Sequence, residues 1–289
     1  MTDLVLDRAG PQDLQAHYED LSRYIRDITE EEIATFWQNG WVKAPGFVSP
    51  ELCEQVIAHY MSWIGLRWKE WPTDPADQAE FKSKIEGIIG NPAATFGIRR
   101  ADPWMFNYVT QRKFGEAAAR FLKVPSIKPL SETLHVKYPI SSGFGRKLGW
   151  HQDFAALPID RAEAMQTWVA LVPVTPDMGP MTHLTGSHRE MPGGRLSTFE
   201  DPQEIYPELW EKYEQSVPTP LGQGDAIFHH ALTWHASGVN QTDRVRWAMS
   251  SYRMSGRCQY TGGQNYNTDG LGLTPWKHFD HPNYPTVYP

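Results

Sequence analysis

Two patterns of hydrophobic and polar residues follow each other along the chain. Up to about residue 126, apolar residues recur at helical spacing between capping signals, whereas from Ile127 onward short β-rich runs are broken by proline, glycine and asparagine. Apolar residues three or four positions apart indicate amphipathic helices, and short alternating runs indicate strands. We therefore expect a mainly helical first part and a sheet-rich second part.

Capping signals locate the helices of the first part. Thr29 and Glu32 stand at the spacing of a capping box, and Asn39-Gly40 ends that helix. Ser49-Pro50 opens a second helix that runs to about Trp63, because serine is a good cap and proline suits the first helical position. A further helix is predicted over residues 114–122, and residues 64–110 are predicted to form loops with short helices.

The second part is predicted to be a β-sandwich or jelly roll, because its β-rich runs follow each other at short intervals. One helical insertion is expected at about residues 202–215. The predicted strands include residues 132–138, 167–174, 225–228 and 244–252.

A chain of 289 residues without a linker or internal repeat is expected to form a single domain. Within residues 1–289 we predict a mainly helical part at 1–126, a jelly-roll core at 127–260 and a C-terminal tail at 261–289. The fold class is then mainly β with flanking helices, a double-stranded β-helix of the cupin-like jelly-roll type.

Composition narrows the expected partners. The 27 basic and 34 acidic residues give a net charge of −7, the wrong sign for a protein that binds the phosphates of nucleic acids. No apolar segment resembles a signal peptide or a membrane span. Cys53 and Cys258 are too few for a disulfide framework and fit buried thiols in a reducing cytosol. We expect a cytoplasmic protein without nucleic-acid or membrane partners, and its oligomeric state does not follow from the sequence.

His151 and Asp153 are candidate metal ligands. Residues two apart on a strand point to the same face, so this imidazole and carboxylate can hold one ion together. A third, distant histidine would complete a triad of two histidines and one carboxylate, which leaves three positions of iron(II) open. His278 and Asp280 repeat the spacing in a proline-rich tail, where no later strand can supply a third ligand. We interpret that second pair as structural.

The third ligand is sought among the histidines that follow Asp153. His235 is favoured because it precedes a Ser-Gly turn and an arginine eleven residues later, Arg246. A hairpin through residues 238–243 would bring both side chains to one end of the barrel. Adjacent histidines on a strand face opposite ways, and those in the glycine-bounded segment are interpreted as hydrogen-bonding or substrate-side residues. The histidines considered are His183, His188, His229, His230 and His235.

Arg246 is a candidate clamp for a dicarboxylic acid. Its planar guanidinium can hold a carboxylate through two parallel hydrogen bonds. Arg244 competes for this role, since both arginines point to the same face of a strand. The position relative to the turn favours Arg246.

At these residues the chain resembles the phytanoyl-CoA dioxygenase family of iron(II)- and 2-oxoglutarate-dependent oxygenases. The family pattern is His-x-Asp, then a distal His-x-Ser-Gly-x-Asn-x-Thr followed by arginine. Residues 179–189 also resemble its Gly-x-x…Gly-Ser/Thr-His-Lys/Arg segment, so the resemblance covers most of residues 28–289. The matching residues are His151, Asp153, His235, Ser237, Gly238, Asn240, Thr242 and Arg246.

The resemblance implies the cofactors and the site residues. It implies iron(II) held by His151, Asp153 and His235, with 2-oxoglutarate as the cosubstrate and dioxygen as the oxidant. It further implies a set of cosubstrate-binding residues, namely Arg246, Ser237, Trp168, Thr133 and Lys137.

The expected activity is hydroxylation of an unactivated C–H bond in a small metabolite or natural-product intermediate, with release of succinate and carbon dioxide. Nothing in the sequence specifies a coenzyme A thioester. Desaturation, epimerisation and ring closure stay open, whereas retention of Asp153 argues against a halogenase, because chloride would need its position. Candidate substrate-binding loops are the one with Phe144 and Arg146, residues 154–160 and residues 260–288.

Two rival functions use the same fold. The first is a jelly roll whose three ligands hold zinc, and the second is a binding protein that has lost turnover. Arg246 and Trp168 argue against the zinc site, because it needs no clamp for a dicarboxylate. The intact ligand set argues against the binding protein.

Overall fold

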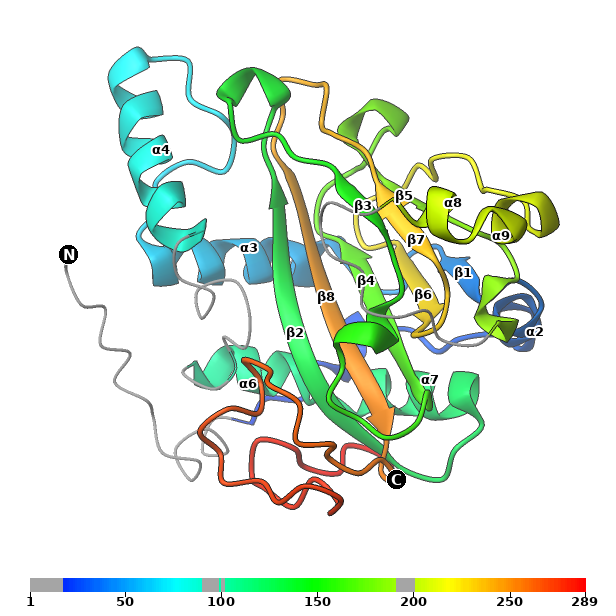
Figure 1. Cartoon of the computed structure of the whole chain (residues 1–289). Helices are drawn as coiled ribbons and strands as arrows, with labels where there is room; N and C mark the ends of the chain where they lie inside the picture. The colour runs from blue at the N-terminus through cyan, green and yellow to red at the C-terminus, as the bar shows by residue number, and fades with distance from the viewer. Residues whose placement is uncertain (1–17, 90–98, 100–101, 191–200) are drawn as a thin grey trace.

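The structure of the protein is a computed structural model, which describes residues 18–89, 99, 102–190 and 201–289. In these ranges, helices flank a body of antiparallel strands (Figure 1). None of these helices is both long and apolar enough to cross a bilayer. The helices are α2 (Glu30–Asn39), α3 (Pro50–Ile64), α4 (Pro75–Ile89), α6 (Pro103–Val109), α7 (Arg112–Leu122), α8 (Pro202–Ile205) and α9 (Pro207–Lys212).

The strands form two antiparallel sheets. The large sheet has the order β1-β6-β4-β8-β2, and the small sheet has the order β3-β7-β5. The predicted fold class, mainly β with flanking helices, agrees with this arrangement. The strands are β1 (Trp41–Ala44), β2 (Ile127–Lys137), β3 (Leu148–His151), β4 (Ala164–Ala170), β5 (Met181–His183), β6 (Ala226–His230), β7 (His235–Ser237) and β8 (Arg246–Ser255).

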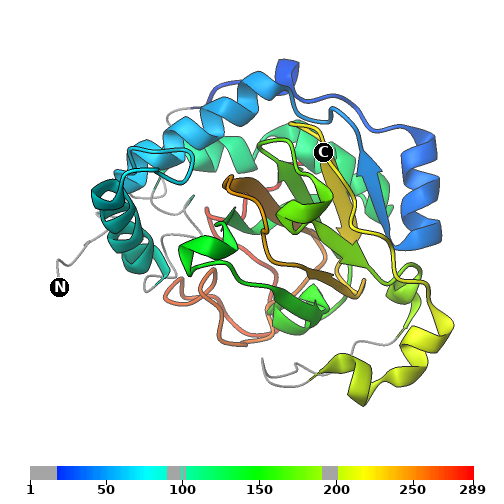
Figure 2. The ribbon, with the colours of Figure 1, turned by 90° about the horizontal axis from the view of Figure 1, so that it is seen from above.

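The large sheet separates two environments. The small sheet lies over one face, which we call the inner face, and helices α3 and α7 lie on the other side (Figures 1 and 2). Side chains alternate between the faces along β8, so Trp247 and Met249 join the apolar core under the helices while Ala248 and Ser250 point inward. The inner face is therefore free to carry polar chemistry.

The capping signals act as the sequence predicts. The Thr29 side chain accepts a hydrogen bond from the backbone N–H of Glu32, and the Glu32 side chain accepts one from the N–H of Thr29. Gly40 then ends α2 at a φ of +79°, where a Cβ atom would lie 2.5 Å from His188 Nδ1. Only glycine therefore fits the junction between α2 and β1. At the start of the next helix, the Ser49 side chain caps α3 by accepting a hydrogen bond from the N–H of Leu52.

Three local predictions differ from the structure. Residues 64–110 contain α4, a helix of 15 residues, which begins where Asp74 accepts hydrogen bonds from the N–H groups of Ala76 and Asp77. Asp153 does not lie on a strand, because β3 ends at His151 and a short 3-10 helix begins at Asp153. Residues 238–243 do not close a hairpin, because β7 and β8 belong to different sheets.

The strand ends also shift from the predicted ones, and β2 begins five residues earlier, at Ile127 rather than residue 132. The predicted insertion at 202–215 is present as the short helices α8 and α9. Cys53 and Cys258 are buried free thiols, as expected.

Candidate metal centre

His151, Asp153 and His235 meet between the two sheets. One ligand atom of each residue can be chosen so that all lie within 4.8 Å of one another. Asp153 Oδ1 is 3.6 Å from His151 Nε2 and 3.7 Å from His235 Nε2. The other ring nitrogens are held by backbone carbonyls, at 2.8 Å from Gly149 O for His151 and at 3.0 Å from Thr233 O for His235. Both Nε2 atoms therefore face a common point beside the carboxylate.

The electrostatics favour an ionised Asp153 and a neutral His235, whereas the Asp153 carboxylate outweighs burial at His151 and raises the pKa of that imidazole. Burial by itself would raise the pKa of Asp153, but the imidazoles of His235, His151 and His229 hold that pKa well below its usual range. Burial holds the pKa of His235 well below its usual value. An ionised carboxylate beside a neutral imidazole is ready to bind a cation. Two imidazole nitrogens and one carboxylate oxygen suit iron(II), so the residues present fit that ion.

Two further side chains bind the Asp153 carboxylate. His229 Nε2 lies 2.8 Å from Oδ2, and the Tyr252 hydroxyl donates to Oδ1 at 2.8 Å. Sequence reasoning considered His229 as an alternative ligand and expected either it or His230 to point into the pocket, but it missed Tyr252. The signal for both was the alternation of the strands, which sends these residues to the inner face.

The remaining candidate histidines do not join the three ligand atoms, although the ring of His183 lies 6.0 Å from that of His235, centroid to centroid. His183 is fully buried, stacks on Trp41 at 4.5 Å, and has no hydrogen-bond partner for its ring among the described residues. Of the two roles expected for it, hydrogen bonding within the protein is not seen, and contact with the substrate stays a prediction. His188 and His230 lie near Trp37 instead, and His230 points away from His229, as adjacent residues on a strand must.

Arg246 lies on the inner face and is buried, with an exposure of 3%. Its Nη1 donates to the carbonyl oxygen of Gly179 at 2.6 Å, while Nε has no partner in the described part of the chain. Its guanidinium carbon lies 5.2 Å from the ring centroid of Trp168. Burial lowers the pKa of Arg246 to about 10, so the group stays charged at neutral pH. Arg244, its competitor, is on the surface near Glu70.

Lys137 and Ser237 lie beside Arg246. Lys137 is in register with Arg246 on the neighbouring strand, and its Nζ donates to Ser237 Oγ at 2.8 Å and to the carbonyl oxygen of Gly238. Burial, together with the charge of Arg246, lowers the pKa of Lys137 to about 7. Thr133 is buried in register with Ser250, whose hydroxyl lies 3.4 Å from the Thr133 carbonyl oxygen. All five residues suggested as cosubstrate contacts thus belong to one interior.

Gly179 allows two loops to approach closely at this end of the interior. It adopts a φ of +65°, and a Cβ atom there would lie 2.4 Å from the carbonyl oxygen of Gly238. A side chain at position 179 would push apart the loop that holds Arg246 and the loop that follows Ser237.

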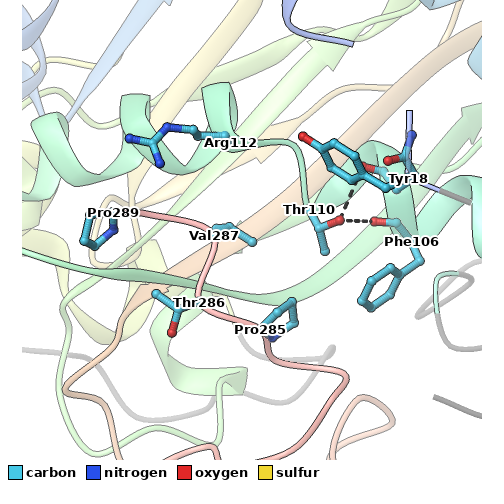
Figure 3. Close-up of a pocket in the computed structure, with 9 residues that line it drawn as sticks. Tyr18, Phe106, Thr110, Arg112, Pro285, Thr286, Val287 and Pro289 are labelled. Atoms are coloured by element: carbon cyan, nitrogen blue, oxygen red, sulfur yellow. Dashed lines mark hydrogen bonds between the residues drawn. The ribbon is translucent and has the colours of Figure 1, made fainter. Parts of the chain in front are cut away.

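Two other features lie away from this interior. His278 contacts the carbonyl oxygen of Cys258 at 3.4 Å, and the neighbouring Phe279 is fully buried. A pocket of about 420 Å³ lies beside α6 and the last residues of the chain, where the Thr110 hydroxyl donates to the carbonyl oxygen of Phe106 at 2.7 Å (Figure 3). None of the predicted metal or cosubstrate residues lines that pocket, but Pro285, Thr286 and Val287 of the candidate substrate-binding segment 260–288 do.

The sequence of the chain is similar to a known family and to a characterised hydroxylase. The family model for phytanoyl-CoA dioxygenase matches residues 36–248. The methylphosphonate hydroxylase of Gimesia maris is 25% identical over 226 residues, which are 76% of this chain and 78% of that protein.

Two solved structures show the same fold. The non-haem α-ketoglutarate-dependent carbocyclase SnoK from nogalamycin biosynthesis has a TM-score of 0.69 at 20% identity, over 90% of this chain and 96% of that one. The epimerase SnoN, in complex with Fe3+, α-ketoglutarate and nogalamycin RO, has a TM-score of 0.66 at 21% identity, over 89% of this chain and 98% of that one. The predicted jelly roll is confirmed by these likenesses.

Proposed function

The chain belongs to the phytanoyl-CoA dioxygenase family of iron(II)- and 2-oxoglutarate-dependent oxygenases, and from this premise we propose that it hydroxylates an unactivated C–H bond of a small metabolite or natural-product intermediate. Members of this enzyme class use iron, 2-oxoglutarate and dioxygen. The observation that carries the proposal is the presence of a three-ligand site and a buried arginine in the same barrel interior.

In the proposed enzyme, His151, Asp153 and His235 hold the iron. The bound metal, with 2-oxoglutarate and dioxygen, supplies an oxidant that can cleave a C–H bond while the cosubstrate leaves as succinate and carbon dioxide. The protein orients the metal ligands. One backbone carbonyl holds Nδ1 of each histidine and fixes the plane of its ring, so Nε2 keeps its direction during turnover.

Arg246 is proposed to bind the distal carboxylate of 2-oxoglutarate. Its Nε has no partner among the described residues and is buried, and a charged hydrogen bond is stronger in such surroundings than in water. Ser237 and Lys137 offer a hydroxyl and an ammonium group at the same end, and Trp168 offers a flat apolar wall under the guanidinium. Thr133 completes the set from the neighbouring strand.

The substrate is proposed to approach from the side of His151. The His151 side chain is 34% exposed, whereas that of His235 is only 3% exposed, so the site opens on the β3 side. Partly buried apolar side chains from the loops suggested for substrate binding pack against one apolar cluster, and they include Phe154, which follows Asp153, Leu157 and Leu271. They would exclude water and guide an apolar part of the substrate.

A different outcome of the same chemistry has specific support. Two of the solved structures with the same fold are a carbocyclase and an epimerase, so ring closure or epimerisation is the second candidate. Both outcomes follow removal of a hydrogen atom and separate from hydroxylation only afterwards. Turnover under labelled dioxygen distinguishes them: hydroxylation places one labelled oxygen atom in the product, and the other two reactions place none.

The experiment that tests the function combines metal, cosubstrate and substrate. Purified protein with iron(II) and 2-oxoglutarate in the absence of air is expected to show a weak charge-transfer band at about 500 nm. Small metabolites are then screened for those that stimulate succinate release. Asp153→Ala should abolish both signals, and Asp280→Ala, in the second His-x-Asp sequence, should retain them. Absence of the band from the wild-type protein would support a zinc site or a binding protein.

A further inference from the structure

The Asp153 carboxylate is bound by the large sheet at both of its oxygens. Asp153 itself comes from the short helix after β3, but its two polar partners, His229 and Tyr252, come from β6 and β8. Each partner contacts a different oxygen at 2.8 Å. The carboxylate is thus held by a sheet to which it does not belong.

The register of the large sheet explains why the two partners reach one carboxylate. His229 is directly opposite Gln166 on β4, and Gln166 is directly opposite Tyr252 on β8. The three residues form one row across three adjacent strands, with all side chains on the inner face. Asp153 contacts the two ends of that row, His229 and Tyr252.

The two oxygens have different surroundings. Oδ1 is the one nearer to the ligand nitrogens of His151 and His235, at 3.6 and 3.7 Å. Oδ2 is 2.8 Å from His229 Nε2. A carboxylate that binds a metal carries no proton, so it can only accept here, and the proton must lie on His229 Nε2. His229 Nδ1 is buried and has no partner among the described residues, so Nε2 makes the only hydrogen bond of this ring that they show.

We infer that His229 and Tyr252 are positioning residues that present Oδ1 of Asp153 to the metal and hold Oδ2 away from it. This inference rests on the proposed function and goes beyond it by assigning the orientation of one ligand to a row of the opposite sheet. A residue on a short helix at the end of a strand has few backbone constraints. Two directed hydrogen bonds replace those constraints.

The inference predicts effects on metal binding before any cosubstrate is added. Removal of an outer partner of a metal ligand lowers metal affinity by about tenfold to 100-fold. Cobalt(II) titrations of the metal-free protein are therefore expected to show a loss of this size for His229→Phe and for Tyr252→Phe. His229→Gln should recover part of the affinity, because a glutamine amide can donate from nearly the same place as Nε2.

Matched controls separate positioning from general damage. His230→Phe makes the same replacement at the next residue of β6, whose side chain points to the other face, and should keep cobalt affinity. Tyr108→Phe removes another buried hydroxyl, one with no partner among the described residues, and should also keep it. Circular dichroism and the unfolding midpoint of each variant report whether it is folded.

A spectroscopic signature distinguishes positioning from mere structural support. The Tyr252 hydroxyl draws charge from Oδ1, so its removal makes Asp153 a stronger donor to the metal. In Tyr252→Phe, loaded with iron(II) and 2-oxoglutarate without air, the charge-transfer band should shift to longer wavelength. In His229→Phe, Oδ2 becomes free to approach the metal, and the cobalt(II) absorption spectrum should change in intensity.

Two results would overturn the inference. One is cobalt affinity within about twofold of wild type in both folded variants, with unchanged spectra. The other is an equal loss in His229→Phe and His230→Phe without recovery in His229→Gln. Failure of the proposed function would look different, because the wild-type protein would then show no charge-transfer band with iron(II) and 2-oxoglutarate at all.

Discussion

The two faces of the large sheet carry different properties of the protein on the same strands. Along β8, Trp247 and Met249 pack under the helices, while Arg246, Ser250 and Tyr252 line the interior on the other side. On the outer face, Trp247 and Met249 are packed in the apolar core, and Arg253 is buried with hydrogen bonds to Ser251 and to the carbonyl oxygen of Val109. The inner face contains Arg246 Nε and His229 Nδ1, which are buried and have no partner in the described part of the chain. We expect changes on the outer face to affect stability and changes on the inner face to affect ligand binding.

The largest expected effect is on the outer face. Trp247 is fully buried, and its indole N–H donates to the carbonyl oxygen of Lys69 at 2.9 Å. Trp247→Ala should lower the free energy of unfolding by about 3–5 kcal/mol, because it leaves a large cavity. Urea unfolding measures this loss. Trp276→Ala, at an exposed position, is the control and should change the free energy by no more than about 0.5 kcal/mol. The division between the faces is wrong if Trp247→Ala is stable but no longer binds 2-oxoglutarate.

The matching change on the inner face is Arg246→Leu. Loss of two charge-assisted hydrogen bonds should weaken 2-oxoglutarate binding by about 100-fold or more. Stability should change little, since the substitution removes a buried charge. Titration of the metal-loaded variant with 2-oxoglutarate measures the first effect and urea unfolding the second. Arg244→Leu, on the surface near Glu70, should leave both unchanged. Equal weakening in the two variants would contradict the assignment of the clamp.

A pH effect sharpens the description of the inner face. Burial, with the charge of Arg246, lowers the pKa of Lys137 to about 7, so this lysine is largely neutral above that pH. A dianionic cosubstrate favours the charged form, and its binding must then take up a proton. The affinity for 2-oxoglutarate should therefore fall by up to about tenfold per pH unit above pH 7. Binding to the metal-loaded enzyme is measured from about pH 6.5 to about pH 8.5. Lys137→Met should flatten the profile; an unchanged slope in that variant would assign the proton to another group.

The smallest expected effect is on the free energy of unfolding, when the N-terminal cap of α2 is removed. Thr29→Ala removes the side chain that caps α2 and should lower the free energy of unfolding by about 1 kcal/mol. Thr35→Ala, in the middle of the same helix, should not destabilise the protein, because alanine favours helices. Thermal unfolding compares the two variants. Cosubstrate affinity should be the same in both, since neither residue faces the barrel interior.

The sequence predicted those parts of the molecule that depend on local spacing. The capping box at Thr29, the turn at Gly40 and the proximity of His151 and Asp153 all follow from residues a few positions apart. The helix α4 was missed although Asp74-Pro75 is a start signal, because its sequence is rich in charge and shows no clean period.

Other parts depend on contacts between distant segments. The Tyr252 hydroxyl reaches Asp153 only because β8 and β3 lie in facing sheets, and no spacing rule relates positions 99 residues apart. The crossing of the chain from β7 to β8 was also predicted as a hairpin, since a Ser-Gly turn is the same signal in both cases. Resemblance to a family suggested the metal ligands, but it did not predict that His229 and Tyr252, in one row of the large sheet, contact Asp153.

The length of β8 has a consequence for selectivity. Arg246 starts this strand, and Tyr252, which contacts Asp153, lies six positions further along it. The backbone of a single strand therefore fixes the distance between the Arg246 guanidinium and the Asp153 carboxylate. In the proposed binding mode, a keto diacid of unsuitable length could contact Arg246 or the metal beside Asp153, but not both. Under the binding mode proposed for 2-oxoglutarate, the hydrogen-bonded backbone of β8 would select the co-reactant, whereas the loops, which can diverge without changing that distance, would select the molecule to be oxidised.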